Sequence, residues 1–217
     1  METLSRQQVA LTDGLDDWRV LAQGLHARFR GGDLVGAARF AGAVAALPAS
    51  AEHADLRLDG GAVDVRVCTR VDGLWLTADD VALARAVSAL AAEHGLVPEP
   101  AEVTQVELAL DTADDARLGP FWSAVLTGSA DNTVLDSVID PTGRTPSMWF
   151  QGTEPHEAPR QRWHLDVWVA PEVAASRIAT ALAAGGTVVD ESQAPSFTVL
   201  ADPDGNKVCV CTSLDRA

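Results

Sequence analysis

The sequence is poor in cysteine, in basic residues and in long apolar runs, and each shortage excludes a class of protein. Three cysteines, Cys68, Cys209 and Cys211, cannot build a disulfide framework in a chain of 217 residues. A formal net charge of −15 argues against nucleic acid, which needs a basic stripe, and against anionic membranes. No stretch approaches the ~18 apolar residues of a membrane-spanning helix, and residues 1–11 lack the apolar core of a signal peptide. We therefore expect a cytoplasmic protein with a small-molecule ligand, no nucleic-acid partner and no membrane contact.

The second half of the chain contains one pattern twice. The first copy reads V-E-L-A-L-D around Glu107, then a helix-like run, then I-D-P-T-G ahead of W-F-Q at 149–151. The second reads W-H-L-D-V-W-V around His164, then a helix-like run, then A-D-P-D-G ahead of V-C-V-C at 208–211. In both turns proline fixes φ and glycine supplies a positive φ. A duplicated βαβββ unit cannot bury its own sheet, so we expect the copies to pair around a shared cavity.

Strand alternation divides the residues of these segments between two faces. Leu165, Val167 and Val169 share one face, and His164, Asp166 and Trp168 share the other. Glu107 lies likewise opposite the leucines and valine that surround it. We expect the aliphatic faces to pack under the helices and the polar faces to line the cavity.

The first half reads as a separate α+β domain. Asp33 can cap a helix that ends before Pro48, Val63 to Val67 alternate as a half-buried strand, and Thr77 can cap a second helix that ends at Gly95. Two prolines in V-P-E-P-A-E-V favour an extended segment. The prediction is an α+β protein of two domains: residues 1–97 with two helices on an antiparallel sheet, a linker at 98–103, and residues 104–217.

The first half resembles the pterin-4a-carbinolamine dehydratase family. The resemblance rests on W-R-x-L-x-x-x-L-H-A-R-F-R from Trp18, A-E-H-A-D-L-R-L, V-x-V-R-V-C-T and G-L-W-L-T-A-D-D. It implies a site in which histidines donate and accept protons to expel a hydroxyl from a pterin ring.

The histidine pattern of that family is altered here. Its paired-histidine positions read Glu52 and His53, and its third histidine falls on Arg70. Glu52 and His53 are the catalytic candidates that the resemblance implies, although an arginine cannot exchange a proton at useful pH and instead places a fixed cation in the pocket as a ligand-binding residue. Asp80 matches the acidic position of the family and is equally explained as a helix-start residue.

The second half resembles the glyoxalase, bleomycin-resistance and dioxygenase superfamily, in its glyoxalase-like branch. The residues that carry the resemblance are L-D-T-A-D-D-A-R-L-G-P-F-W, M-W-F-Q, Q-R-W-H-L-D-V-W-V and V-L-A-D-P-D-G-N-K-V-C-V. It implies paired βαβββ modules and ligand positions at Glu107, His164 and Cys209, with a fourth near Gln151. Trp168 and Asp166 would line the same cavity with Gln151.

Whether this set holds a divalent metal stays open. Carboxylate, imidazole and thiolate can each bind a metal, but a soft thiol beside a hard carboxylate is not a usual glyoxalase set. A metal-free pocket, in which Glu107 or His164 is an acid/base group, is the alternative.

Three functions follow as expectations. The leading one is a small-molecule enzyme or binder with lyase or isomerase chemistry in the glyoxalase-like cavity. The alternatives are a 4a-hydroxytetrahydrobiopterin dehydratase in the first domain and a ligand-sequestering protein that performs no reaction. Both resembled families commonly self-associate, which leaves a homo-oligomer open.

Overall fold

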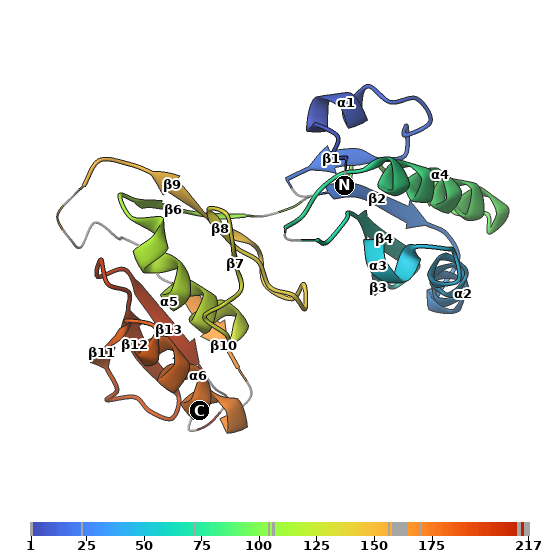
Figure 1. Ribbon diagram of the computed structural model, residues 1–217. Coiled ribbons are helices and arrows are strands. Elements are labelled where there is room, and N and C mark those ends of the chain that lie inside the picture. The colour runs from blue at the N-terminus through green and yellow to red at the C-terminus, as the bar shows by residue number, and fades with distance from the viewer. Residues whose placement is uncertain are drawn as a thin grey trace. The chain divides into compact units, whose positions relative to one another are not determined.

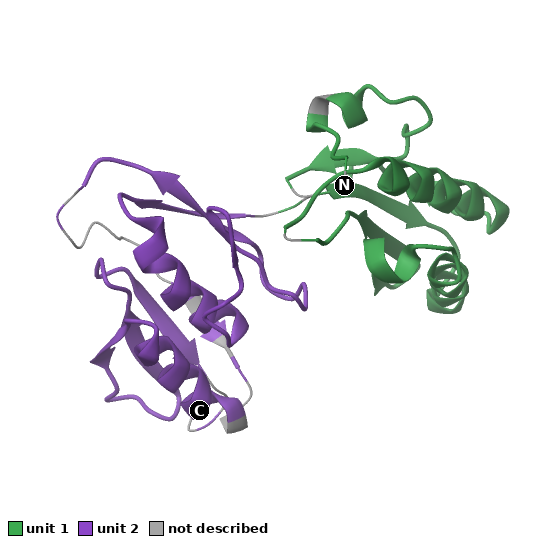
Figure 2. Cartoon of the chain, in the orientation of Figure 1, with its two compact units in different colours: residues 1–105 green, residues 106–217 purple. Residues whose placement is uncertain are grey.

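The chain folds into two compact units, Met1–Gln105 and Val106–Ala217 (Figure 2). The computed structural model describes residues 2–22, 24–71, 73–103, 105, 107–155, 157, 165–169, 171–211 and 214, with the backbone alone at 7, 166, 168, 171 and 172. Each unit has its own hydrophobic core. The α+β fold in two domains is therefore confirmed.

The first unit is an antiparallel sheet with two long helices on one face (Figure 1). The strands follow the order β1-β2-β4-β3, and the short strand β5 pairs with the end of β2 outside this order. The elements are α1 (Arg6–Ala10), β1 (Arg19–Leu21), β2 (Gly24–Arg30), α2 (Leu34–Ala45), α3 (Ser50–His53), β3 (Ala54–Asp59), β4 (Ala62–Val67), α4 (Ala78–Glu93) and β5 (Val97–Pro98).

Both long helices begin at the predicted capping residues. Asp33 accepts a hydrogen bond from the backbone N–H of Gly36 at the start of α2. At the start of α4, Thr77 and Asp80 form a reciprocal capping box, in which each side chain accepts from the other residue's backbone N–H.

The two faces of the first sheet differ in chemistry. Leu25, Phe29 and Val65 lie on the face that packs against α2 and α4 and are almost fully buried. The other face carries charged residues in cross-strand pairs, for example Arg28, whose Nη1 lies 2.7 Å from Oδ1 of Asp64. The alternation seen in the sequence therefore separates a core face from a charged face.

Part of the segment expected as a linker is held by the first sheet. Val97 and Pro98 pair with Arg30 and Phe29 of β2, and the N–H of Glu99 donates to the carbonyl of Arg28. Glu99 also bonds Nε of Arg30 at 2.7 Å. These contacts fix the start of the segment 98–103 to β2.

The second unit consists of two modules with the same order of elements. The first contains β6 (Leu108–Thr112), α5 (Asp115–Thr127), β7 (Thr133–Val134), β8 (Ser137–Val138) and β9 (Met148–Gly152). The second contains β10 (Leu165–Trp168), α6 (Pro171–Ala183), β11 (Thr187–Asp190), β12 (Phe197–Ala201) and β13 (Lys207–Cys211). In both, the first strand runs parallel to the last, in the sheets β6-β9-β8-β7 and β10-β13-β12-β11. The duplicated βαβββ pattern is thus confirmed.

The two D-P-x-G turns have the backbone that the sequence predicts. In each turn the glycine N–H donates to the aspartate carbonyl three residues earlier, at 3.0 Å. Gly143 has φ +65° and Gly205 has φ +87°, a region that disfavours other residues.

The modules pack through their helices and share one hydrophobic core. The first D-P-x-G carboxylate, Asp140, interacts electrostatically with Arg177 of α6, and Arg177 donates to the carbonyl of Val125 in α5 at 2.5 Å. The second, Asp202, accepts from Nε1 of Trp122 in α5 at 2.9 Å. Each turn is therefore tied to the helix of the other module.

Within the part of the chain that the structure describes, no helix has the length and apolar character needed to span a membrane.

Candidate functional site

His53 and Asp80 form the most complete acid/base arrangement among the described side chains. Nδ1 of His53 lies 2.7 Å from Oδ1 of Asp80. His53 ends the short helix α3, directly before β3, and Asp80 lies in the first turn of α4. The histidine side chain is 12% exposed and the carboxylate 0%, so the contact is largely shielded from water while a small part of the histidine stays accessible.

The Asp80 carboxylate is surrounded by donors. Its Oδ2 accepts from the hydroxyl of Thr69 at 2.8 Å, from the hydroxyl of Thr77 at 2.9 Å and from the N–H of Thr77 at 2.7 Å. A carboxylate has no proton to give, so Nδ1 of His53 is the donor to Asp80. Nε2 is then the ring nitrogen with a lone pair, and it can take a proton from a ligand and return it.

A strained residue precedes the turn that presents His53. Ala49 has φ +67°, in the left-handed region, and α3 begins at the next residue. Ser50 is buried and donates from Oγ to the carbonyl of Val44 at 2.6 Å, which ties the turn to the end of α2. The turn is thus held from the helix side before the chain enters β3.

The three other predicted residues of this domain differ in setting. Glu52 is exposed on α3, so the protein itself does not desolvate its carboxylate. Arg70 is an ion-pair partner of Asp55, with Nη2 2.5 Å from Oδ2, and is 32% exposed. Asp80 is a helix-start residue, as the sequence allows, and its carboxylate also contacts His53.

Arg70 belongs to a cluster at the end of β4. Arg66 also bonds Oδ2 of Asp55, through Nε at 2.9 Å and Nη2 at 2.5 Å. Cys68 lies between the two arginines in sequence and is fully buried. Burial raises the pKa of its thiol, an effect that the charges of Arg66 and Arg70 oppose in part, so this cysteine stays a thiol.

In the second unit, Glu107 stands just before β6 on the predicted polar face. Its Oε1 accepts from the hydroxyl of Ser147 at 3.1 Å, next to the start of β9. The parallel register places Asp111 opposite Gln151 and Ala109 opposite Trp149, on the face of Glu107. The leucines between them, Leu108 and Leu110, pack against the core, as expected.

The second module presents a different surface. Cys209 lies opposite Asp166 of β10 and opposite Val199 of β12 in the strand register, and Cys209 and Cys211 are buried. Leu165, Val167 and Val169 pack against the core, as the sequence predicts. The backbone places Asp166 and Trp168 on β10, whereas His164 lies outside the described residues.

Whether the second unit holds a divalent metal, which the sequence leaves open, is not decided by the described residues. Among the described residues, no three histidine, cysteine, aspartate or glutamate side chains gather closely enough to hold a metal ion. The proposed set of Glu107, His164 and Cys209 includes one residue outside that part of the chain, and its donors combine hard oxygen with soft sulfur.

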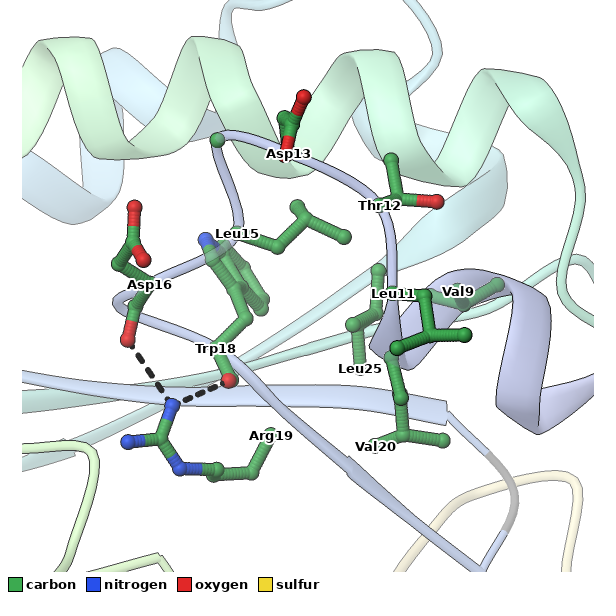
Figure 3. Close-up of a pocket in the computed structure, with 12 residues that line it drawn as sticks. Val9, Leu11, Thr12, Asp13, Leu15, Asp16, Trp18, Arg19, Val20 and Leu25 are labelled. Carbon is green, nitrogen blue, oxygen red and sulfur yellow. Dashed lines mark hydrogen bonds between the residues drawn. The ribbon is translucent and has the colours of Figure 1, made fainter.

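A cavity of about 650 Å³ lies elsewhere in the first unit, between the end of α1, the loop that follows it and β1 (Figure 3). Val9, Leu15 and Leu25 contribute apolar walls. Arg19 lies at its edge, where Nη1 donates to the carbonyls of Asp16 and Trp18 at 2.9 and 2.7 Å. Its lining contains none of the residues proposed here for proton transfer.

Two family models match the chain, one in each unit. Residues 2–90 match the family "Pterin 4 alpha carbinolamine dehydratase", and residues 107–211 match "Glyoxalase-like domain". The chain joins a pterin-4a-carbinolamine dehydratase domain to a glyoxalase-like domain. No curated protein matches it.

Three solved structures that are similar to this chain each match about half of it. A glyoxalase/bleomycin resistance protein from Albidiferax ferrireducens T118 is 20% identical, with a TM-score of 0.39 over 49% of this chain and 95% of its own. A glyoxalase/dioxygenase from Nostoc punctiforme is 15% identical, with a TM-score of 0.36 over 54% and 95%. A hypothetical protein from S. aureus is 13% identical, with a TM-score of 0.38 over 51% and 94%.

Sequence reasoning missed three residues of the dehydratase-domain cluster: Thr69, Asp55 and Arg66. The signal for Arg66 and Asp55 was the alternation of charge on β3 and β4, but the pairing register that joins them is visible only in the folded sheet. No sequence pattern marks Thr69, because its hydroxyl meets Asp80 through tertiary packing.

Proposed function

We propose that the protein is a lyase that dehydrates a small ring carbinolamine in its pterin dehydratase domain. The observation that carries the proposal is the 2.7 Å contact between Nδ1 of His53 and the fully buried carboxylate of Asp80. A buried carboxylate that fixes one tautomer of a histidine leaves the other ring nitrogen ready for proton transfer. The family match to residues 2–90 supports a pterin ring as the substrate class.

The proposed reaction needs one group that takes a proton and one that gives a proton. In a carbinolamine, the hydroxyl and a nitrogen are bonded to the same carbon. Loss of the N–H proton to Nε2 of His53 forms a C=N bond, and the hydroxyl leaves as water once it receives a proton. The imidazolium of His53 can return its proton to the leaving hydroxyl. Atoms balance as substrate to product plus one water.

The test is turnover of 4a-hydroxytetrahydropterin by the full chain and by His53→Gln. Wild-type protein should exceed the uncatalysed rate, and His53→Gln should lose about 10²-fold or more of the added rate, which is typical of general acid–base catalysis. His94→Gln is a matched control, because His94 is exposed at the end of α4. Turnover at the background rate in the wild type, or equal rates in wild type and His53→Gln, would overturn the proposal.

A second candidate function belongs to the glyoxalase-like domain. Glu107, Asp111, Trp149 and Gln151 share one strand face, on which carboxylates adjoin an aromatic ring and an amide. Such a face suits a small polar ligand, with Glu107 as an acid/base group and His164 as its partner. This candidate would carry out a lyase or isomerase reaction beside a carbonyl, or would bind a ligand without changing it.

Panels of α-keto and thiol-adduct substrates test that second candidate. Turnover that falls in both Glu107→Gln and His164→Gln but not in Glu154→Gln would support catalysis, since Glu154 is exposed and comes after β9. A ligand that binds and is recovered unaltered would support sequestration instead. Elemental analysis of the purified protein, before and after chelation, would decide whether Glu107, His164 and Cys209 hold a divalent metal.

A further inference from the structure

We infer that Arg70, together with Arg66, makes the His53 site selective for substrates that carry an anionic group, a carboxylate or a phosphate. The inference rests on the proposed function and adds the charge of its substrate. It starts from an ion-pair cluster in which two arginines share a single carboxylate oxygen, Oδ2 of Asp55.

The charges of this cluster do not cancel. Arg66 and Arg70 both bond Asp55, which leaves one positive charge in excess. The nearest acidic residue along β4, Asp64, is already bonded by Arg28 at 2.7 and 2.8 Å. The chain as a whole has a net charge of −15, so the excess positive charge of these three residues at the end of β4 is opposite in sign to that of the protein.

The two guanidinium groups are fixed yet reachable. The side chains of Arg66 and Arg70 are 25% and 32% exposed. Each guanidinium carries five N–H donors, and Asp55 takes two from Arg66 and one from Arg70. Because the carboxylate already holds both groups in place, an incoming anion orders little side chain when it binds.

The hairpin that carries Arg70 is firmly held. Thr69 and Trp75 exchange two backbone hydrogen bonds of 2.9 Å, and Nε1 of Trp75 donates to the carbonyl of Val71 at 3.0 Å. Arg70 therefore directly follows a residue whose backbone N–H and carbonyl are both hydrogen-bonded. A guanidinium placed in this way suits planar, bidentate recognition of a carboxylate or phosphate.

The residues of the cluster are close to His53 in the sequence or are joined to it by hydrogen bonds of their neighbours. Asp55 is two residues after His53, and the N–H of Cys68 donates to the carbonyl of His53 at 2.9 Å. Thr69, which precedes Arg70, has its hydroxyl 3.2 Å from Nδ1 of His53. The strand end that carries Arg70 therefore lies beside the residue that carries the imidazole.

A matched pair of fluorescent ligands tests the inference. Pterin-6-carboxylate and 6-hydroxymethylpterin share a ring and differ in one anionic group. The full-length wild type should bind the carboxylate about tenfold or more tightly than the alcohol, as expected for hydrogen bonds to a charged group. Arg70→Gln should lose this preference. Arg57→Gln should keep it, because Arg57 is exposed on β3 and has no ion pair among the described residues.

Other outcomes separate the inference from the proposed function. Equal affinities for the two pterins in the wild type, or an undiminished preference in Arg70→Gln, would overturn the inference even if turnover is found. A preference that Arg70→Gln abolishes, in a protein without dehydratase turnover, would support the anion site and refute the dehydratase. If neither pterin binds, inorganic phosphate decides: a rise in melting temperature that Arg70→Gln removes supports the site, and no rise refutes it.

Discussion

Nδ1 of His53 and Oδ1 of Asp80 lie 2.7 Å apart, although the two residues are 27 positions apart in the sequence. The contact joins the end of α3 to the start of α4. Asp80 therefore has two tasks, because the same carboxylate caps its own helix through the N–H of Thr77. One carboxylate thus both caps α4 and bonds the imidazole of His53.

Asp80→Asn should impair both tasks. The amide nitrogen of asparagine would face N–H and O–H groups that now donate hydrogen bonds to the carboxylate. We therefore expect a loss of about 1–3 kcal/mol in the free energy of unfolding. Dehydratase turnover should fall by about 10²-fold or more, because a neutral amide cannot balance the charge of the imidazolium that forms when His53 takes a proton. Asp79→Asn is the control, since Asp79 is exposed in the same turn. Urea denaturation and turnover assays would measure both effects, and equal behaviour of the two variants would refute the assignment.

Trp122→Phe should destabilise the glyoxalase-like domain. The substitution removes the 2.9 Å hydrogen bond from Nε1 and leaves the buried carboxylate of Asp202 with one donor fewer. We expect a loss of about 1–3 kcal/mol in the free energy of unfolding, measured by circular dichroism in urea. Trp149→Phe makes the same chemical change at a half-buried position and should cost less. A larger loss for Trp149→Phe would contradict the proposed anchor.

The stability of the first domain should fall as the pH drops from about 6.5 to about 4. Burial, and then the charge of Arg66, lower the pKa of His26 to about 4 from 6.5. Between these values the unfolded chain binds a proton that the folded protein does not, so stability is fully present above pH 6.5 and is lost toward pH 4. The full loss is of the order of 3 kcal/mol.

His26→Gln tests the origin of this dependence. Glutamine keeps a polar side chain but cannot titrate, so the fall in stability over this window should become shallower. Chemical denaturation at several pH values would measure the slope. An unchanged slope in His26→Gln would assign the pH dependence to other groups.

Ala49→Gly should stabilise the dehydratase domain. Ala49 has φ +67°, which costs an alanine about 1 kcal/mol more than a glycine. The gain should approach that value, less the greater freedom of glycine in the unfolded chain. Ala46→Gly is the control, because Ala46 has φ −84° and should lose stability. Melting temperatures would show opposite signs for the two variants, and a loss in both would show that the left-handed backbone at residue 49 is not strained.

The fold could be predicted in detail because local rules decide most of it. Asp33 and Thr77 begin helices as capping residues must, and Val63, Val65 and Val67 alternate as a half-buried strand does. The repeated D-P-x-G turns predict the duplication from the sequence alone, without knowledge of the strand pairing. The aliphatic faces of β6 and β10 likewise followed from alternation.

The sites were predicted less completely because their contacts are non-local. Arg70 was expected as a fixed cation in the pocket, but the sequence did not show that the pairing of β3 with β4 gives it Asp55 and Arg66 as neighbours. The capping role of Asp80 could be predicted from the sequence, whereas its contact with His53 depends on tertiary packing. A residue's partners depend on strand register, which a sequence pattern fixes only to the level of the face.

The reciprocal docking of the two D-P-x-G turns has a consequence for the integrity of the glyoxalase-like domain. Asp202 of the second module accepts a hydrogen bond from Trp122 in α5, and Arg177 in α6 donates to the carbonyl of Val125 in α5. The ring of Phe121 in α5 lies against Gly186 of the second module, where a methyl group would not fit. Severing the peptide chain between the modules would remove a tether but none of these ties. The two fragments should therefore stay bound to each other as a non-covalent complex.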